Sequence, residues 1–427
     1  MVDGVNTGPE ASVSGADPLS TRAPRGPGFG FWIVMIYLGA RLVTTGLMLL
    51  ASAMSGPDSR FGVNPGLAPF ILGWDAQWYW LVAVNGYPAE LPLTETGAVA
   101  ENAWAFMPLY AFLSQAVSLP FALLSQAVGI PFAAWGVGGF LVAIAAGLGC
   151  CFVLFQMVRD RIGDTAALWS VALFASAPLA ALFQVAYAES LFLLWLLLSL
   201  WCVRRRRYGW LYLLIPLMAF TRPGVLAFAL FLGLFGLWRW FRRDREPLGR
   251  TEVVHILALG GLAVVTGFAW QVIVGIVTGD PGGYLATELA WRRNWVTDGG
   301  VFMPFHGWFA GAEFWLRSWG APAGFGIAAA VVLMLGAAAI LLFEPHVRRL
   351  GVEVRLWSAS YLVYLFAVFF PQSSIFRLLF PLSPLWGAVA TPRSTIWRVG
   401  ALAVCLAGQW WWIWNMYGLA NMYWQVP

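Results

Sequence analysis

Charge is what this 427-residue sequence has least of. Only 11% of its positions are charged, whereas 60% are hydrophobic. In soluble globular proteins about a quarter of the residues are charged. The composition therefore excludes an ordinary soluble domain and is typical of a polytopic membrane protein. The net charge of +5 does not indicate nucleic-acid binding, because the cationic residues occur in short clusters between apolar runs.

Lysine is absent, and cysteine and histidine are scarce. The three histidines are isolated, so no histidine metal site is predicted. No GxGxxG, GxxxxGK[ST], HExxH or GxSxG motif stands in a supporting context, which disfavours soluble-type nucleotide and hydrolase sites. The cysteines fall within apolar runs without CxxC spacing, which favours buried thiols over disulfides or metal ligands. They are Cys150, Cys151, Cys202 and Cys405.

Long apolar runs make up most of the chain. A membrane span needs about 20 mostly apolar residues, and fewer where a helix is broken or buried among others. The sequence predicts an all-α integral membrane protein with about eleven spans in one polytopic domain, 29–414. The predicted spans are 29–54, 132–158, 164–184, 187–203, 208–221, 224–240, 253–277, 323–343, 355–371, 377–391 and 397–414. Residues 1–28 are expected to form a disordered cytoplasmic tail and 415–427 a short outer tail.

Arginine clusters between the spans predict the orientation in the bilayer. The threading places all of them on one side, which the positive-inside rule makes cytoplasmic. The clusters lie at 22–25, 159–161, 204–207, 239–250, 348–349 and 393–398. The opposite side carries two long loops, 55–131 and 278–322, the first of them acidic. We therefore expect a multi-pass plasma-membrane protein with two extracytoplasmic loops.

The apolar stretch 105–128 within the first loop is interrupted by prolines. A crossing here would invert the side of every later arginine cluster. We therefore expect this stretch to lie in, or dip into, the outer leaflet.

Asp75 stands in the aromatic stretch GWDAQWYWLVAVNGYP, residues 73–88, just beyond the first apolar run. Aromatic residues favour the membrane interface, where a carboxylate is a candidate general base for a sugar hydroxyl. The alternative is structural: an interfacial helix begins at Asp75, which serves as its N-cap. Spacing alone leaves both interpretations open.

Three further charged residues occupy unusual places. Glu189 lies at the outer end of a span that has no other charges. It is either a functional acid or a carboxylate at a helix start, where the helix dipole favours it. Arg222 follows a short apolar run at a Pro-Gly break, and Arg377 lies near the outer end of a late span. Each arginine suits a phosphate oxygen or snorkels toward lipid headgroups. Arg41, inside the first span, must face the protein interior or a polar cavity.

In their order along the chain, these motifs resemble the PIG-V family. Its members are the second mannosyltransferases of glycosylphosphatidylinositol anchor assembly and bacterial relatives, within the GT-C class of membrane glycosyltransferases. The family's WD motif, aromatic stretch and GY are matched by Trp74, Asp75, Tyr79, Gly86 and Tyr87. Its aromatic-Pro and YSESLF-like motifs are matched by residues 106–110 and 187–192, and its later arginine motifs by residues 222–224 and by Arg377, Phe380, Pro381 and Pro384. Met107 and the stretch TRPGV depart from the family pattern.

The resemblance implies a GT-C-like bundle that transfers mannose from polyprenyl-phosphate-mannose to an extracytoplasmic hydroxyl, with inversion and Asp75 as general base. The acceptor would be a glycolipid, a polysaccharide or a protein. A phosphate leaving group needs no acid opposite the base, and a lipid-borne sugar needs no nucleotide cofactor. No acidic cage supports a divalent metal, and the expected partners are the donor, membrane lipids and the acceptor. The substrate-binding residues implied are Trp74, Tyr79, Tyr87, Tyr187, Glu189, Arg222 and Arg377.

Two other functional classes fit parts of the pattern. A transporter or lipid flippase would also use Glu189 and outward-facing arginines along its path. The absence of matching inverted halves and the long aromatic outer loops disfavour it. A non-catalytic membrane scaffold would have no chemical need for the carboxylate of Asp75.

Overall fold

The computed structural model describes residues 28–128, 131–293 and 302–427. Within these ranges the regular structure is helical, as predicted, apart from an isolated antiparallel bridge between Leu93 and Val99. The predicted tail, except for Gly28, and residues 294–301 of the second loop lie outside the described residues.

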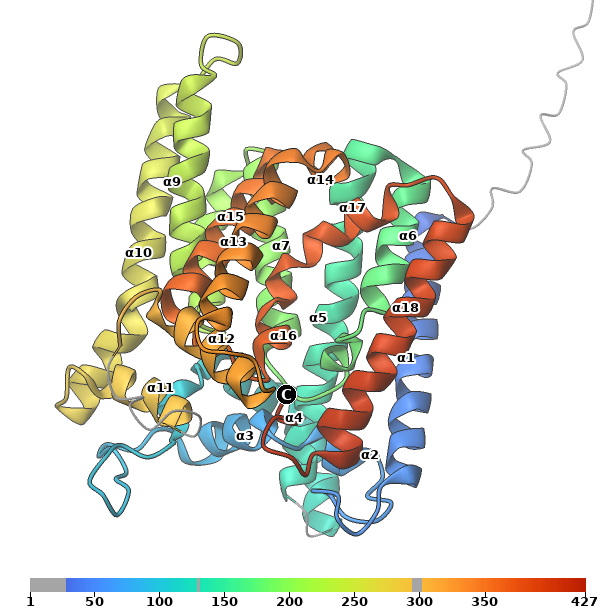
Figure 1. The fold of residues 1–427 in the computed structure, drawn as a ribbon, viewed down its shortest axis with the longest axis vertical. Coiled ribbons are helices and arrows are strands. Elements are labelled where there is room, and N and C mark those ends of the chain that lie inside the picture. Colours follow the sequence, from blue (N-terminus) through green and yellow to red (C-terminus); the bar gives the residue numbers. More distant parts are fainter. Residues whose placement is uncertain (1–27, 129–130, 294–301) are drawn as a thin grey trace, which may run out of the picture.

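Long apolar helices form the body of the molecule (Figure 1). By length and composition, four of the described helices could cross a membrane: α1 (Phe29–Met54), α5 (Pro131–Ile162), α10 (Arg250–Thr278) and α13 (Phe325–Phe343). Other helices pack among them: α6 (Asp164–Ala175), α7 (Glu189–Arg204), α8 (Leu211–Ala219), α9 (Val225–Phe241), α15 (Val352–Val368), α17 (Trp386–Ala390) and α18 (Thr395–Ile413). The chain is therefore a multi-pass membrane protein. The total of about eleven spans stays a prediction.

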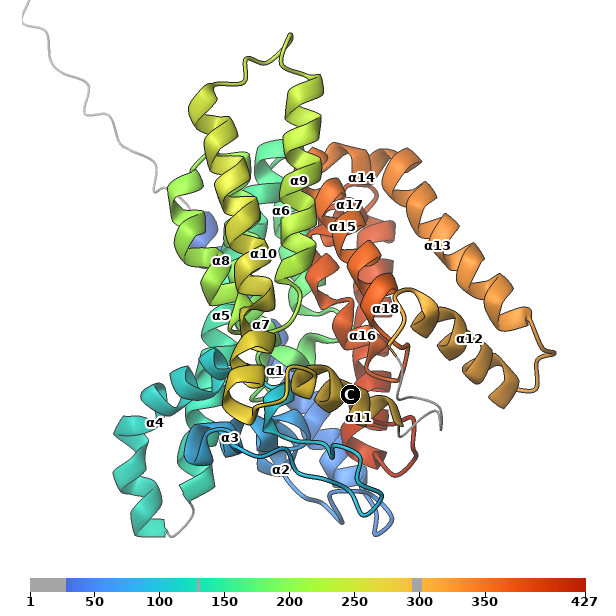
Figure 2. The same cartoon turned by 90° about the vertical axis from the view of Figure 1, so that its left-hand side faces the viewer.

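Shorter elements gather at the end of the bundle that also holds the C-terminus, here called the loop end (Figure 1). They include α2 (Leu67–Ile71), α3 (Asp75–Asn85), the 3-10 turn η1 (Ala103–Ala105), α4 (Pro108–Val128) and α11 (Gly283–Arg293). The helix α12 (His306–Ser318) pairs with α13, and this hairpin leans away from the other helices (Figure 2).

The first half of α4 folds back along the start of α5 at the loop end. The Tyr110 hydroxyl donates to the carbonyl of Gly139 over 2.9 Å, and Trp135 Nε1 donates to the carbonyl of Ala111 over 3.2 Å. A Cβ at Gly138 would lie 2.1 Å from the Ser114 carbonyl oxygen, so only glycine permits this approach. This pairing of α4 with α5 holds α4 beside α3 and the end of α8 (Figure 2).

Two predicted spans are broken rather than continuous. The sequence predicts one span over 164–184, but α6 ends at Ala175 and the chain continues through the 3-10 turn η2 (Ala180–Phe183). Pro178 has no N–H to continue the helix. The buried Arg41 donates to the carbonyls of Ala175 and Ala180 across this break. This confirms that Arg41 faces the protein interior, where it satisfies carbonyls that the break leaves free.

The predicted span 377–391 is likewise divided. It consists of α16 (Ile375–Leu378), the 3-10 turn η4 (Phe380–Leu385) and α17. Pro381 and Pro384 cannot donate helical hydrogen bonds, which accounts for the tighter turn between the two short helices. The four cysteines are free and buried in the packed interior, as predicted.

The arginine clusters from 159–161 onward lie at the end of the bundle opposite the loop end, here called the arginine-rich end; the cluster at 22–25 lies outside the described residues. This end includes the loop between α9 and α10 and the short helix α14 (Pro345–Arg349) (Figure 1). Ion pairs join its clusters across helices: Arg161 Nη2 lies 3.2 Å from Glu353 Oε2, and Arg205 Nη2 lies 2.5 Å from Asp160 Oδ2. The clusters thus share one end of the fold, with many of their charges compensated.

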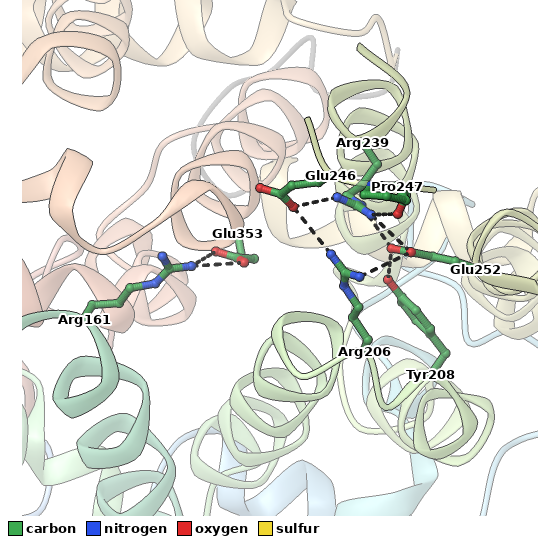
Figure 3. A network of polar contacts seen from close by, with 8 residues as sticks. All are labelled: Arg161, Arg206, Tyr208, Arg239, Glu246, Pro247, Glu252 and Glu353. Carbon is green, nitrogen blue, oxygen red and sulfur yellow. Dashed lines mark hydrogen bonds and ion pairs between the residues drawn. The ribbon is translucent and has the colours of Figure 1, made fainter. Parts of the chain in front are cut away.

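Arg239 organises the densest network at this end (Figure 3). Its guanidinium is 1% exposed and donates to Glu246 over 2.8 Å, to Glu252 over 3.0 Å and to the Pro247 carbonyl over 3.1 Å. The Tyr208 hydroxyl donates to Glu252 over 2.9 Å. Each nitrogen of the buried guanidinium therefore has a partner. These hydrogen bonds tie the α9–α10 loop to the start of α10.

We expect Arg239→Ala to destabilise the protein by about 3 kcal/mol or more, because it leaves Glu252 nearly buried with a weakened set of partners. Thermal unfolding of the purified protein in lipid nanodiscs measures this loss. Arg245→Ala, at an exposed arginine of the same loop, is the matched control and should change stability by about 0.5 kcal/mol or less. Equal midpoints for the two variants would contradict a structural role for the Arg239 network.

Candidate functional site

Asp75 is the first residue of α3, and its carboxylate turns into the protein rather than onto its own helix. Arg377 donates from Nη1 to Asp75 Oδ2 across 302 positions of sequence. The start of α3 has no side-chain cap. The alternative that Asp75 caps the helix is therefore wrong, although the helix does begin there.

The residue before Asp75 has an unusual backbone. Trp74 has φ +55°, a left-handed value that a bulky residue rarely adopts and that costs about 1–3 kcal/mol. Its indole Nε1 donates to the Met416 carbonyl over 3.0 Å, and the Arg60 guanidinium lies 4.0 Å from its ring centroid. These contacts hold the sharp turn that aims Asp75 at Arg377.

Glu189 joins two arginines into one buried array. It begins α7 and forms an ion pair with Nη1 of Arg222, while Arg377 Nε lies 3.2 Å from its Oε1. Together with Asp75 these residues form two carboxylates and two guanidiniums, called here the charged cluster. The side chain of Glu189 is only 3% exposed, whereas that of Asp75 is 22% exposed. Asp75 is thus the carboxylate that a substrate reaches most readily.

Both arginines of the cluster come from helix breaks. Arg222 precedes Pro223 and Gly224 between α8 and α9, and Gly224 has φ +137°, which favours glycine. Arg377 lies in the four-residue helix α16, ahead of the proline-containing turn η4. Broken helices within a membrane fold are tolerated where they face protein or a polar cavity, and here they supply the cations.

The cluster is electrically paired but incompletely hydrogen-bonded. Glu189 Oε1 is the atom that both guanidiniums contact, whereas Glu189 Oε2 is buried and lacks a hydrogen-bond partner among the described residues. Buried charged groups normally satisfy their hydrogen-bonding capacity, so each such atom calls for an explanation. Glu189 therefore retains acceptor capacity for hydroxyl groups of a ligand.

Tyrosine side chains surround the cluster. Tyr79 and Tyr187 were both predicted from the sequence. The charges of Asp75 and Arg377 lie close enough to act on their hydroxyl groups. The Arg377 guanidinium carbon is 5.6 Å from the Tyr187 ring centroid. The ring of Tyr79 packs edge-on against Tyr110, with 5.0 Å between centroids. The structure thus brings both tyrosines to the charged cluster.

Trp74 and Tyr87 make other contacts. Trp74 packs edge-on against Phe61, besides its bond to Met416. The Tyr87 hydroxyl donates to the Phe106 carbonyl over 2.7 Å, and its ring stacks on Trp104 at 4.5 Å. These contacts position the loop around α3. The substrate-binding roles expected for the two residues stay predictions.

Three residues near the cluster were not predicted from the sequence. Tyr361 and Tyr417 lie within electrostatic reach of it. Glu288, on α11 of the second loop, faces Arg222 and accepts a hydrogen bond from Tyr284; burial raises the pKa of its carboxyl group above the ordinary value. No motif marked these residues, because their significance arises only from the fold.

In the described part of the chain, no group of three or more His, Cys, Asp or Glu side chains could hold a metal ion. The charged cluster itself supplies carboxylates and guanidinium cations, with phenolic hydroxyls beside them.

No family model matches the chain, and no curated protein matches it. Among solved structures it is similar to ArnT from Cupriavidus metallidurans bound to undecaprenyl phosphate, with 15% identity and a TM-score of 0.47 over 89% of this chain and 63% of that one. It is also similar to the archaeal oligosaccharyltransferase AglB from Archaeoglobus fulgidus, in complex with an inhibitory peptide and a dolichol-phosphate. The two chains share 12% sequence identity with a TM-score of 0.45, over 93% of this chain and 56% of that one. The chain spans less than two thirds of either protein, and the PIG-V resemblance rests on its motifs alone.

The cluster predicts an order of stability losses. Arg377→Met should cost about 3 kcal/mol or more, because it leaves Asp75 unpaired and Glu189 with one guanidinium. Arg222→Met should cost less, since Glu189 keeps Arg377. Adding Asp75→Asn to Arg377→Met should recover part of the loss, as the orphaned charge is removed. Thermal unfolding in nanodiscs gives the order, and a larger loss for Arg222→Met would refute the bridging arrangement.

Proposed function

We propose that this protein transfers a hexose from a polyprenyl-phosphate donor to a hydroxyl of an acceptor, with Asp75 as general base. The motif resemblance favours mannose as the sugar. The observation that carries the proposal is the pairing of Asp75 with Arg377 in a charged cluster that also contains Arg222 and Glu189. A base and two cations, side by side, are what attack by a hydroxyl on a sugar phosphate requires.

The proposed reaction needs one proton transfer. The acceptor oxygen bonds to the anomeric carbon of the sugar while Asp75 takes the hydroxyl proton. The bond from that carbon to the phosphate oxygen breaks, and its electron pair leaves with the lipid phosphate. One carboxylate suffices, because the phosphate is already a stable anion, and a direct attack inverts the configuration.

Arg222 and Arg377 supply the charge that the leaving phosphate needs. A guanidinium can hold two phosphate oxygens through parallel hydrogen bonds. Glu189 keeps the two guanidiniums together through Oε1, and its Oε2, which has no hydrogen-bond partner among the described residues, is available to a hydroxyl of the sugar. The two arginines thus form the proposed phosphate site, and Glu189 is its positioning residue.

The pairing of Asp75 with Arg377 implies that the donor binds before Asp75 can act as a base. A guanidinium bound to a carboxylate stabilises the ionised form and makes that carboxylate a weaker base. A donor phosphate competes with Asp75 for Arg377, so its arrival releases the base beside the sugar that it must attack. The donor therefore binds before Asp75 becomes fully active.

The orientation belongs to the proposal as well. The charged cluster lies toward the loop end, whereas the arginine clusters lie at the other (Figure 1). With the positive-inside rule, this supports the proposal that the site faces the extracytoplasmic side of the plasma membrane. A glycolipid, a polysaccharide or a secreted protein would meet the donor there.

We expect Asp75→Asn to lower transfer by about 100-fold or more, because an amide cannot take the proton. The assay supplies purified protein in lipid with radiolabelled polyprenyl-phosphate-mannose and with cell-envelope lipids, polysaccharides and proteins as acceptors. Asp58→Asn, at an exposed carboxylate of the same loop, is the matched control and should keep activity. An active Asp75→Asn variant would refute the base assignment. A folded wild type that binds the donor without transferring sugar would favour lipid translocation instead.

Arg222→Ala should raise KM for the donor about tenfold or more, since hydrogen bonds to charged groups contribute about 1.5–3 kcal/mol. KM for the acceptor should stay near the wild-type value. Arg317→Ala, at an exposed arginine paired within α12, is the control and should change neither constant. Steady-state transfer at varied donor and acceptor concentrations measures both, and an unchanged donor KM would place the phosphate site away from Arg222.

A further inference from the structure

The segment after α18 is part of the folded core of the loop end. The helix passes into a π-helical turn, η5 (Trp414–Leu419), which packs against α1. Ser55 Oγ donates to the Gly418 carbonyl over 2.9 Å, and the Arg60 amide donates to the Leu419 carbonyl over 3.0 Å. With the Trp74 bond to Met416, these contacts fix η5 next to the start of α3. Single π-helical turns are rare and occur frequently at functional sites.

The π-helical turn places Tyr417 inside the protein beside the charged cluster. The side chain is fully buried, and its ring lies 5.7 Å from that of Phe70. Its hydroxyl lies close to that of Tyr187 and within electrostatic reach of Arg377, Glu189 and Asp75. Four segments distant in sequence thus converge on this hydroxyl pair.

The two hydroxyls contact each other and, among the described residues, no other hydrogen-bond partner. Tyr187 and Tyr417 are both fully buried, their hydroxyls share a side-chain hydrogen bond, and within the described part of the chain neither is bonded to any other group. Because one hydroxyl accepts within the pair, its own O–H is left without an acceptor. A buried hydroxyl without a partner loses its hydration and gains nothing in return, which costs folding free energy. By contrast, the Tyr37 hydroxyl, equally buried on α1, donates to the Ile144 carbonyl over 2.9 Å. The O–H of the pair that has no acceptor, beside the cluster, therefore indicates an acceptor group that is bound there.

We propose that the hydroxyls of Tyr417 and Tyr187, together with Arg377, bind a non-bridging oxygen of the lipid phosphate. This inference rests on the proposed function and makes Tyr417 a further ligand of the donor. The Arg377 guanidinium lies 5.6 Å from the Tyr187 ring centroid, and its charge acts on both hydroxyls. A phenol donates a hydrogen bond without adding charge, and an anionic oxygen is the acceptor that strengthens such a bond most.

The arrangement also separates two tasks. Asp75 lies on one side of Arg377, as its ion-pair partner, and Tyr187 lies against the guanidinium as an aromatic neighbour. A phosphate held by the tyrosine hydroxyls and Arg377 is thereby placed next to Asp75 without needing a contact to that carboxylate. The tyrosines hold the leaving group, and Asp75 remains for the acceptor.

The test is Tyr417→Phe, which removes one oxygen and keeps the ring. We expect its Kd for a polyprenyl phosphate without sugar to rise about tenfold, and the donor KM in transfer to rise in parallel. The acceptor KM should not change. Thermal stability should stay near the wild-type value, because the removed hydroxyl has no hydrogen bond outside its pair with Tyr187. Tyr187→Phe should show the same two changes.

Tyr37→Phe is the matched control, since it removes a buried hydroxyl that is hydrogen-bonded. It should lower the thermal midpoint and leave the Kd for polyprenyl phosphate unchanged. An unchanged Kd in Tyr417→Phe, or a loss of stability as large as that of Tyr37→Phe, would overturn the inference. Lipid binding is measured without transfer, so a wild type that binds the lipid but transfers no sugar counts against the proposed function and leaves the binding comparison intact.

Discussion

The compensation of four charges inside an apolar helical bundle is the constraint on which the rest of the loop end depends. An unpaired buried carboxylate or guanidinium costs several kcal/mol, so Asp75, Glu189, Arg222 and Arg377 are stable there only as a group. Their pairing fixes the start of α3, the start of α7, the break between α8 and α9, and the position of α16. Helix breaks that weaken the bundle are thus the features that deliver its charged groups.

The two ends of the molecule use arginine in different ways. At the arginine-rich end, Arg239 is held by Glu246, Glu252 and a carbonyl oxygen, and each nitrogen has a partner. In the charged cluster, by contrast, Glu189 Oε2 has no hydrogen bond among the described residues, and the two tyrosine hydroxyls beside it are bonded only to each other. A completed network stabilises a fold, whereas an incomplete one leaves donors and acceptors for a ligand.

Local sequence predicted the helices better than it predicted the site. Apolar runs of sufficient length predict where helices lie, because that signal is carried by neighbouring residues, and Pro178, Pro381 and Pro384 mark where they break. The pairing of Asp75 with Arg377 joins residues 302 positions apart, and no local pattern states which arginine meets which acid. The sequence therefore left each charged residue with two interpretations. Tyr417 lay in a stretch expected to be a tail, because nothing local announces a π-helical turn that packs inward.

The most direct test of this account is the structure of the protein with a polyprenyl phosphate bound in a lipid nanodisc, determined by electron cryomicroscopy. The account predicts the phosphate within hydrogen-bonding distance of Arg377 and Arg222, with Asp75 separated from Arg377. Phosphate density at the arginine-rich end, with the pair between Asp75 and Arg377 intact, would contradict it. In that case the charged cluster would be a structural element, and the chemistry would have to lie elsewhere in the fold.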